Sequence, residues 1–241
     1  MLYKTQGIVL KQIKYNDSSK IITIFTKELG RKSFMVYGLG KQKGRKKTAN
    51  IYQPLFLLNI EFNYQENKGL QKLKEVSLLT NYNSIPFSVE KTAIIFFLTE
   101  ILDKIIKFDV VDNQMFDFIS NSLQIFDLQE SNYMNFHLIF LIKITKFLGF
   151  EPSSNHSSEN KYFNISQAKY TANYDEKYSI EEPYSKLFKQ LINTKITNFY
   201  TIKMNNKERS YILNKILIYY SFYIEDLLKI KSLKVLNEVF S

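Results

Sequence analysis

The sequence predicts an α+β protein with an all-β N-terminal part over residues 1–80 and an all-α C-terminal part over residues 81–241. Hydrophobic residues follow a period of two in the first part and a helical period in the second. A third observation is the polar stretch 150–182, which is rich in Ser, Asn and Tyr and has little periodicity. This stretch predicts an insertion in the helical part, partly loop and with room for a small hairpin.

Five strands are expected in the first 80 residues, and alternation is clearest in the fourth. Phe56, Leu58, Ile60 and Phe62 share one face there, while the residues between them are polar or charged. Turn signals separate the strands, which are expected near 5–13, 20–26, 34–37, 56–63 and 70–79. Five short strands in this length indicate a small closed barrel, for which the OB-fold is the obvious candidate.

Helices are expected after Pro86. Ser88 is a suitable N-cap for the first helix, and Asp112 opens the second. The third, near 132–148, is apolar on most sides, so it belongs at the centre of a bundle, and Gly149 fits its C-terminal cap. Further helices are expected after the insertion at 183–192, 206–226 and 232–240.

Composition limits the chemistry. The chain has 241 residues, no Cys and two His, so a disulfide framework, a thiolate nucleophile and a Cys-based zinc site are excluded. His137 and His156 have no visible metal partner, and no pair of carboxylates is placed for acid–base work. We therefore expect no enzyme, no catalytic residue, no metal and no cofactor.

The formal charge points to an anionic partner. Residues 1–50 contain twelve Lys or Arg and two acidic residues, so the whole net charge of +10 falls in the first fifth of the chain. A Lys-rich composition alone would spread the excess evenly, and we interpret the concentration as an anion-binding face.

A glycine-rich basic segment occupies 38–48, but its spacing matches neither Walker A nor G-x-G-x-x-G. Two interpretations of this segment remain: a solvated loop, or a loop that contacts a phosphate backbone. The excess of positive charge in this region favours phosphate contact. Tyr15 and Tyr37 are the better candidates for base stacking among the interleaved aromatic residues. The candidate DNA-binding residues are Lys11, Lys14, Lys20, Arg31, Lys32, Lys41, Lys43, Arg45, Lys46, Lys47, Tyr15 and Tyr37.

No membrane contact is expected. Charged and polar residues interrupt the N-terminal apolar segment, so it is not a signal peptide. The best candidate span, 211–228, contains two acidic residues and one lysine and reads as a buried helix. We expect a cytoplasmic protein.

Short segments in a fixed order carry a resemblance to a known family. They are Gly7-Ile8-Val9-Leu10, Tyr15-Asn16-Asp17-Ser18-Ser19-Lys20-Ile21, Phe25-Thr26, Gly30-Arg31, Gly38 with the basic loop, Gln53-Pro54-Leu55, Phe147-Leu148-Gly149-Phe150 and Lys231-Ser232-Leu233-Lys234-Val235-Leu236. Across nearly its whole length the chain resembles the RecO family of bacterial DNA-repair and recombination mediators. Each segment is weak alone, but their order and spacing together are fairly specific.

The resemblance implies an N-terminal OB-fold, ATP-independent binding of single- and double-stranded DNA, strand annealing and help in loading the RecA recombinase. It implies RecR and the C-terminal tail of the single-stranded-DNA-binding protein as partners, and an association with the nucleoid. The family's tail pocket lies in the helical domain with a basic rim, which here would draw on Lys143, Lys146, Arg209 and Lys215.

The chain departs from the family in three places. Some members hold zinc through four Cys in the insertion, so residues 150–182 must here fold without that metal or stay mobile. Tyr37 precedes Gly38 where the family often has Lys, and Asn135 stands at a basic position before Phe136.

Two alternatives to this function stay open. An OB-fold with a basic loop serves RNA equally well. A protein-interaction adaptor would use the same basic face for an acidic partner.

Overall fold

A computed structural model of the chain describes residues 2–37, 50–107, 110–227 and 229–240. It contains two compact units. The first consists of Met1–Asn83 with Ile95–Gln124, and the second consists of Ser84–Ile94 with residues 125–241.

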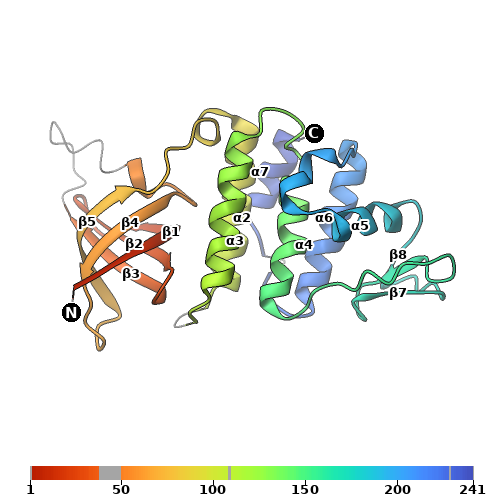
Figure 1. The fold of residues 1–241 in the computed structure, drawn as a ribbon, viewed down its shortest axis with the longest axis horizontal. Helices are drawn as coiled ribbons and strands as arrows, with labels where there is room; N and C mark the ends of the chain where they lie inside the picture. The colour runs from red at the N-terminus through yellow and green to blue at the C-terminus, as the bar shows by residue number, and fades with distance from the viewer. Residues whose placement is uncertain (1, 38–49, 108–109, 228, 241) are drawn as a thin grey trace. The chain divides into compact units, whose positions relative to one another are not determined.

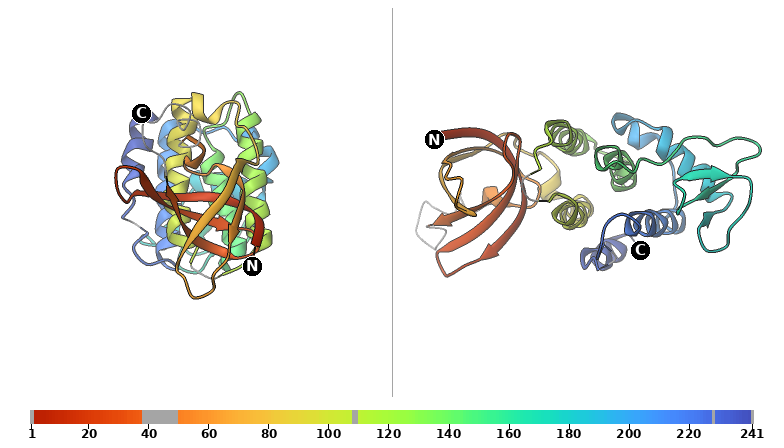
Figure 2. Two further views of the ribbon diagram at one scale, coloured as in Figure 1. Left: turned by 90° about the vertical axis from the view of Figure 1, so that its left-hand side faces the viewer. Right: turned by 90° about the horizontal axis from the view of Figure 1, so that it is seen from below.

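The first unit contains a closed barrel of five strands (Figures 1 and 2). Its strands are β1 (Leu2–Lys14), β2 (Ser19–Thr26), β3 (Gly30–Tyr37), β4 (Leu57–Asn63) and β5 (Leu70–Leu78), and the short helix η1 (Asn50–Tyr52) precedes β4. Around the barrel the order is β1-β2-β3-β5-β4, with β3 and β5 parallel and all other pairs antiparallel. The predicted OB-like barrel and its five strands are confirmed.

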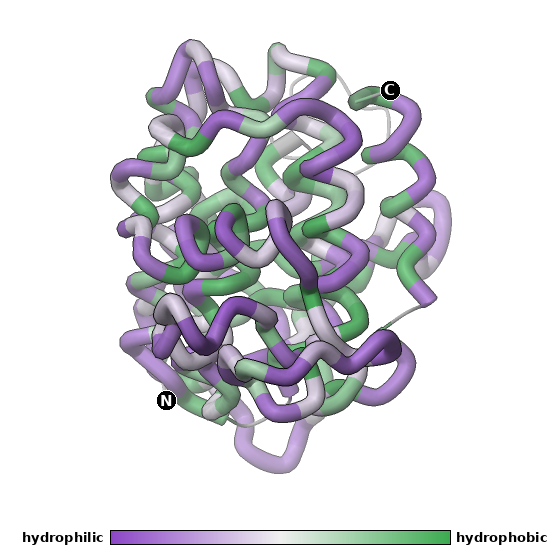
Figure 3. The backbone as a smooth tube through the Cα atoms, turned by 90° about the vertical axis from the view of Figure 1, so that its right-hand side faces the viewer, coloured by the Kyte–Doolittle hydropathy of each residue, from purple (hydrophilic) through white to green (hydrophobic). Residues whose placement is uncertain are grey.

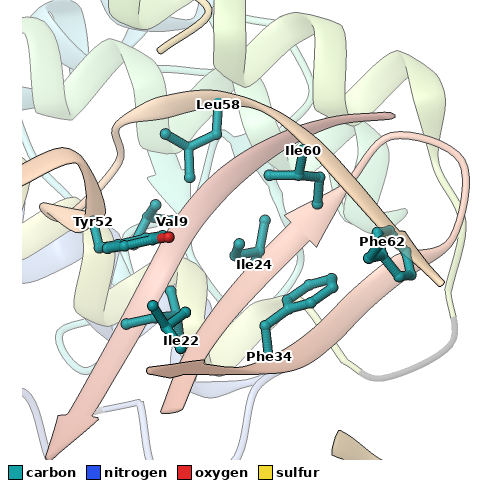
Figure 4. Packing of buried hydrophobic residues seen from close by; sticks show 9 residues of the cluster. Val9, Ile22, Ile24, Phe34, Tyr52, Leu58, Ile60 and Phe62 are labelled. Carbon is teal, nitrogen blue, oxygen red and sulfur yellow. The ribbon is translucent and has the colours of Figure 1, made fainter. Parts of the chain in front are cut away.

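The barrel interior is filled by alternate side chains of the strands (Figure 4). Phe34 and Phe62 meet edge to face with ring centroids 4.9 Å apart. The other interior side chains are Val9, Ile22, Ile24, Val36, Tyr52, Leu58 and Ile60. Phe25 is also fully buried, but it faces outward from the barrel and packs on Phe116 with ring centroids 5.7 Å apart.

An irregularity in β1 changes which side chains face out. Val9 pairs with Ile24 and faces the interior, and the next residue in register is Lys11, which pairs with Thr23. The extra residue, Leu10, is a β-bulge that shifts the alternation by one position. As a result Lys11 and Ile13 face outward although Val9, also an odd-numbered residue, faces in.

Two helices contribute to the first unit, namely α2 (Val89–Ile105) from Ile95 onward and α3 (Asn113–Leu128) as far as Gln124. They cover the outer side of the barrel near Phe25, and Lys27 forms an ion pair with Asp117 of α3 at 2.7 Å. The predicted caps are present. The Lys91 amide donates to Ser88 Oγ at 3.2 Å, and the Met115 amide donates to Asp112 Oδ1 at 2.8 Å.

The second unit is mainly helical, and green and purple segments alternate along its turns in Figure 3, as expected of helices that bury one face. It contains η2 (Ile85–Phe87), α4 (Phe136–Leu148), α5 (Tyr184–Asn193), η3 (Ile196–Thr201), α6 (Asn206–Ser221) and α7 (Ser232–Val239). Gly149 ends α4 in the left-handed conformation, as predicted. The sequence predicted a helix over 206–226, which is too long, because α6 ends at Ser221.

The polar insertion forms a small three-stranded sheet in the order β7-β6-β8. Its strands are β6 (Tyr162–Asn164), β7 (Lys169–Thr171) and β8 (Ser179–Ile180). The Tyr170 hydroxyl donates to the Ser185 carbonyl at 3.0 Å, and its ring packs on Phe163 at 5.1 Å. The Asn155 side chain bonds both backbone polar groups of Tyr170. Aromatic packing and amide hydrogen bonds thus hold this segment together.

Candidate nucleic-acid interface

Part of the outer surface of the barrel is not covered by α2 and α3. Ile13 lies opposite Ile21, Ile21 opposite Met35, and Met35 opposite Lys72 of the parallel strand β5. These four side chains alternate with interior ones, so they lie on the outer side of the barrel. Ile13 and Lys72 are exposed there, Ile21 is half-buried, and Met35 is 8% exposed. We call this surface the open face and include in it Tyr15 and Tyr37.

The two tyrosines lie at one end of the open face. Tyr15 is 64% exposed and Tyr37 is 61% exposed. The Tyr15 amide donates to the Ser19 carbonyl at 3.0 Å, and Ser19 pairs with Tyr37 across β2 and β3. The Lys72 amine lies 5.7 Å from the Tyr37 ring centroid. Two exposed rings and a cation therefore gather where β1 ends and β2 begins.

The lysines predicted from the sequence are divided between two sides of the β1–β2 hairpin. Lys11 shares the outward side with Ile13, and its amine is 3.5 Å from an Asp103 carboxylate oxygen. Lys14 and Lys20 lie opposite each other on the other side. Lys14 is paired with Asp17 at 2.7 Å, and the Lys20 amine donates to Gln12 Oε1 at 2.9 Å.

Arg31 is placed in a structural role. Arg31 is 8% exposed, and its guanidinium donates to the carbonyls of Asp103 and Ile106 at 2.5 and 2.8 Å. It also donates to the Asp103 carboxylate at 2.5 Å. Asp103 lies in the last turn of α2 and Ile106 directly follows the helix, so Arg31 stabilises this helix end through hydrogen bonds and the helix dipole. Arg31 is therefore left out of the open face.

Lys32 and the five basic loop residues were also predicted to bind DNA and are not included in the open face. Lys32 is half-buried at the start of β3, far along the strand from Tyr37, with its amine 5.9 Å from the Tyr64 ring centroid. The five basic loop residues lie outside the described residues, and they are Lys41, Lys43, Arg45, Lys46 and Lys47.

Lys72 is the cation that sequence reasoning missed. Its neighbours Met35 and Tyr37 are more than 30 positions away in the chain, and a parallel strand pair brings them together. The alternation of β5 alone gave a signal for outward residues, but it did not show which strand would lie beside it.

In the second unit, Arg209 lines a pocket of about 440 Å³ together with Tyr133, Met134, Lys203 and Met204. Its guanidinium donates to Asn135 Oδ1 at 2.9 Å, Asn206 Oδ1 at 2.7 Å and the Met204 carbonyl at 3.1 Å. Burial lowers the pKa of Arg209 from its ordinary value. The pocket combines thioether and aromatic surface with two cations and the carboxylate of Glu130.

The other three cations expected at this pocket lie apart from it. Lys143 donates to the Ile192 carbonyl, and burial lowers its pKa. Lys146 is exposed in the last turn of α4, about 16 Å along the helix axis from Asn135 at the other end. The Lys215 amine lies 3.4 Å from the Ser179 carbonyl. Only Arg209 of the four thus lines the pocket.

Neither a metal site nor a membrane span occurs in the described part of the chain. No group of three or more His, Asp or Glu there is arranged to hold a metal ion. None of the described helices is long and apolar enough to cross a membrane.

The fold and the open face define a protein with an OB-type barrel, a class whose strand faces and loops bind oligonucleotides and oligosaccharides. Two family models match the sequence: "Recombination protein O N terminal" over residues 1–82 and "Recombination protein O C terminal" over residues 86–234.

Relatives described as "DNA repair protein RecO" align over the whole of both chains. The relative from Flavobacterium psychrophilum is 34% identical over 241 residues, and that from Bacteroides fragilis is 33% identical over 242 residues. The relative from Azobacteroides pseudotrichonymphae is 31% identical over 241 residues. The chain belongs to the RecO family, and its role is in DNA repair, as the resemblance predicted.

Proposed function

We propose that this chain binds DNA without sequence preference and anneals complementary strands, with no need for ATP. The observation that carries the proposal is the open face of the barrel, where two exposed tyrosines and Lys72 adjoin the apolar row formed by Ile13, Ile21 and Met35. Family membership supports the choice of DNA as the ligand.

Each part of the open face has a physical task. Tyrosine rings stack on bases of any identity, each contributing about 1–3 kcal/mol. Lysine amines contact phosphates and release counterions, and this contribution is independent of sequence. Because single strands offer both bases and phosphates, we expect them to use the whole face, whereas double-stranded DNA contacts the cations.

Annealing follows from the same charges. Two DNA strands repel each other, and neutralising their phosphates on one protein lowers that repulsion so that bases can pair. The basic residues at 41–47 begin four positions after Tyr37 in the sequence, and we propose that they extend the phosphate contacts. Residues 1–80 thus form the proposed DNA-binding domain, and residues 81–241 form the proposed partner-binding domain.

For the second domain we propose RecR and the C-terminal tail of the single-stranded-DNA-binding protein as partners, together with help in loading RecA. The Arg209 pocket suits an acidic peptide that ends in an aromatic residue. Its thioether groups adapt to a ring, and Arg209 and Lys203 offer cations to carboxylates. We propose that the protein works in the cytoplasm at the nucleoid.

The DNA proposal is tested by fluorescence anisotropy with a labelled single strand across a salt series. If four to six phosphates are contacted, log K should fall against log salt with a slope of about −3 to −4. Replacing both Tyr15 and Tyr37 by Ala should weaken binding by about 2 kcal/mol or more. A salt slope near zero, or preference for an RNA competitor of equal length, would contradict the proposal.

The tail pocket is tested with a labelled acidic peptide. Lys203→Ala should weaken peptide binding, whereas Lys146→Ala removes an equal charge outside the pocket and should leave it unchanged. Equal effects of the two variants would refute this pocket as the docking site.

A further inference from the structure

The barrel has a concave site at the opposite end of β3 from Tyr37. A pocket of about 280 Å³ lies between the start of β3 and the hairpin that joins β4 to β5. Lys32 and Ser33 line it from β3, and Tyr64, Lys68 and Gly69 line it from the hairpin. This volume is just below the range of drug-sized ligand sites, so the pocket suits a group as small as one nucleotide.

The hairpin wall of the pocket is fixed in place by Gln71. This side chain is almost completely buried and makes three hydrogen bonds inside the hairpin. Its oxygen accepts the Gln65 amide at 3.0 Å, and its nitrogen donates to the carbonyls of Gln65 and Lys68. A wall held in this way needs little ordering when a ligand binds, which favours affinity.

The Tyr64 ring is held at a fixed angle as well. It meets Tyr3 at 5.5 Å and Phe62 at 6.3 Å, both edge to face, while its residue stays half-buried. The Lys32 amine lies 5.9 Å from the ring centroid. The pocket thus offers an aromatic ring with a cation beside it.

Charge at the pocket favours an anion. Lys68 is exposed, and no ion pair to it occurs among the residues that the structure describes. The charged residues that line the pocket are the cations Arg31, Lys32 and Lys68 and the carboxylate Glu66. Arg31 donates to the Asp103 carboxylate, which is not part of the lining. Asn67 and Ser33 add neutral polar groups suited to a phosphate oxygen or a base edge.

We propose that this pocket binds one nucleotide of single-stranded DNA, with the phosphate at Lys32 and Lys68 and the base at the Tyr64 ring. The inference rests on the proposed function, because it extends the strand that lies on the open face. Ser33 and Tyr37 are four residues apart on β3, about 13 Å, so one strand running along β3 reaches both the tyrosine end and the pocket.

The test uses the full chain and oligo(dT) that carries one 5-iodouracil in turn at each position. Irradiation should cross-link one position to a peptide that contains Tyr64, and mass spectrometry identifies the peptide. In parallel, anisotropy compares Lys68→Ala with Lys4→Ala, which removes an exposed lysine that pairs with Glu61 on another part of the barrel. We expect Lys68→Ala to weaken binding at low salt by about threefold or more and to lower the salt slope by about 0.7.

Each outcome decides one point. If wild type binds oligo(dT), but Lys68→Ala matches Lys4→Ala and no cross-link reaches Tyr64, the pocket inference is wrong and the proposed function stands. If wild type binds no DNA, the proposed function itself fails. Competition with thymidine monophosphate shows whether the pocket binds a free nucleotide or a nucleotide within a DNA strand. A free nucleotide that binds wild type and loses affinity in Lys68→Ala, without any change for oligo(dT), would overturn the assignment to a DNA strand.

Discussion

Replacing Lys91 by Met should destabilise the second unit strongly, although the two side chains are similar in size. Lys91 is 1% exposed, and its amine donates to the carbonyls of Phe126, Asp127 and Gln129 at 3.0, 3.1 and 2.7 Å. It also donates to Ser84 Oγ at 2.5 Å. These carbonyls lie at the C-terminal end of α3 and directly after it. The Phe126 carbonyl also accepts the Gln129 amide at 3.4 Å, and the Asp127 carbonyl also accepts the Ser84 hydroxyl.

The size of the effect follows from those contacts. Methionine fills the space of the lysine stem but leaves the Gln129 carbonyl without this donor, which costs about 1–3 kcal/mol. The carbonyls of Phe126 and Asp127 keep the Gln129 amide and the Ser84 hydroxyl as donors. The amine also lies 4.9 Å from the Tyr133 ring and 5.3 Å from the Phe126 ring, and cation–π contacts of a desolvated amine contribute about 2 kcal/mol. Avoiding the burial of a charge offsets part of this. We expect a net loss of about 3 kcal/mol in the free energy of unfolding.

Urea unfolding measures this loss. The chain has no Trp, so tyrosine fluorescence and far-ultraviolet circular dichroism serve as the two probes. Lys146→Met is the matched control, because Lys146 is exposed on α4 and its replacement should change stability by less than about 0.5 kcal/mol. If Lys91→Met loses less than about 1 kcal/mol at an unchanged m value, the reasoning about the α3 carbonyls is refuted.

Three other changes have definite expected outcomes. Gly30 has a φ of +65°, and an added Cβ would lie 2.6 Å from the Val110 carbonyl oxygen. Gly30→Ala should therefore lower the Tm clearly. Gly69→Ala is the control and should leave the Tm unchanged, because no atom lies within 4 Å of a Cβ added there. Burial lowers the pKa of His137 to about 3, so stability present above pH 6.5 is lost as the pH falls towards 3. Between pH 6.5 and 5 wild type should lose about 2 kcal/mol more than His137→Leu, and equal pH profiles in urea titrations would contradict this. A chelator should leave the thermal unfolding curve unchanged, because side chains hold residues 150–182 together, and a lower Tm in EDTA would show a metal there.

Local patterns in the sequence predicted most of the elements. Strand alternation placed the interior residues of β4, and the cap residues Ser88, Asp112 and Gly149 marked helix ends, since each acts on backbone groups within a few positions. The concentration of charge in the first 50 residues predicted an anionic partner, although DNA binding itself stays a prediction.

The candidate site was predicted less completely, because charge alone does not show what surrounds a side chain. From the sequence, Arg31 was a candidate DNA-binding residue. In the structure its guanidinium bonds the carboxylate of Asp103, which lies 72 positions later in α2. Arg209 similarly meets Asn135, 74 positions away.

The sequence by itself determined the fold class, the strands, the helix caps and the family, because periodicity and short motifs depend on residues near one another in the chain. Only the tertiary structure decided which side chains form the open face. The bulge at Leu10 turned Lys11 and Ile13 outward, and the parallel pairing of β3 with β5 brought Lys72 beside Met35. Both depend on strand register, which packing of distant residues sets and no local pattern records.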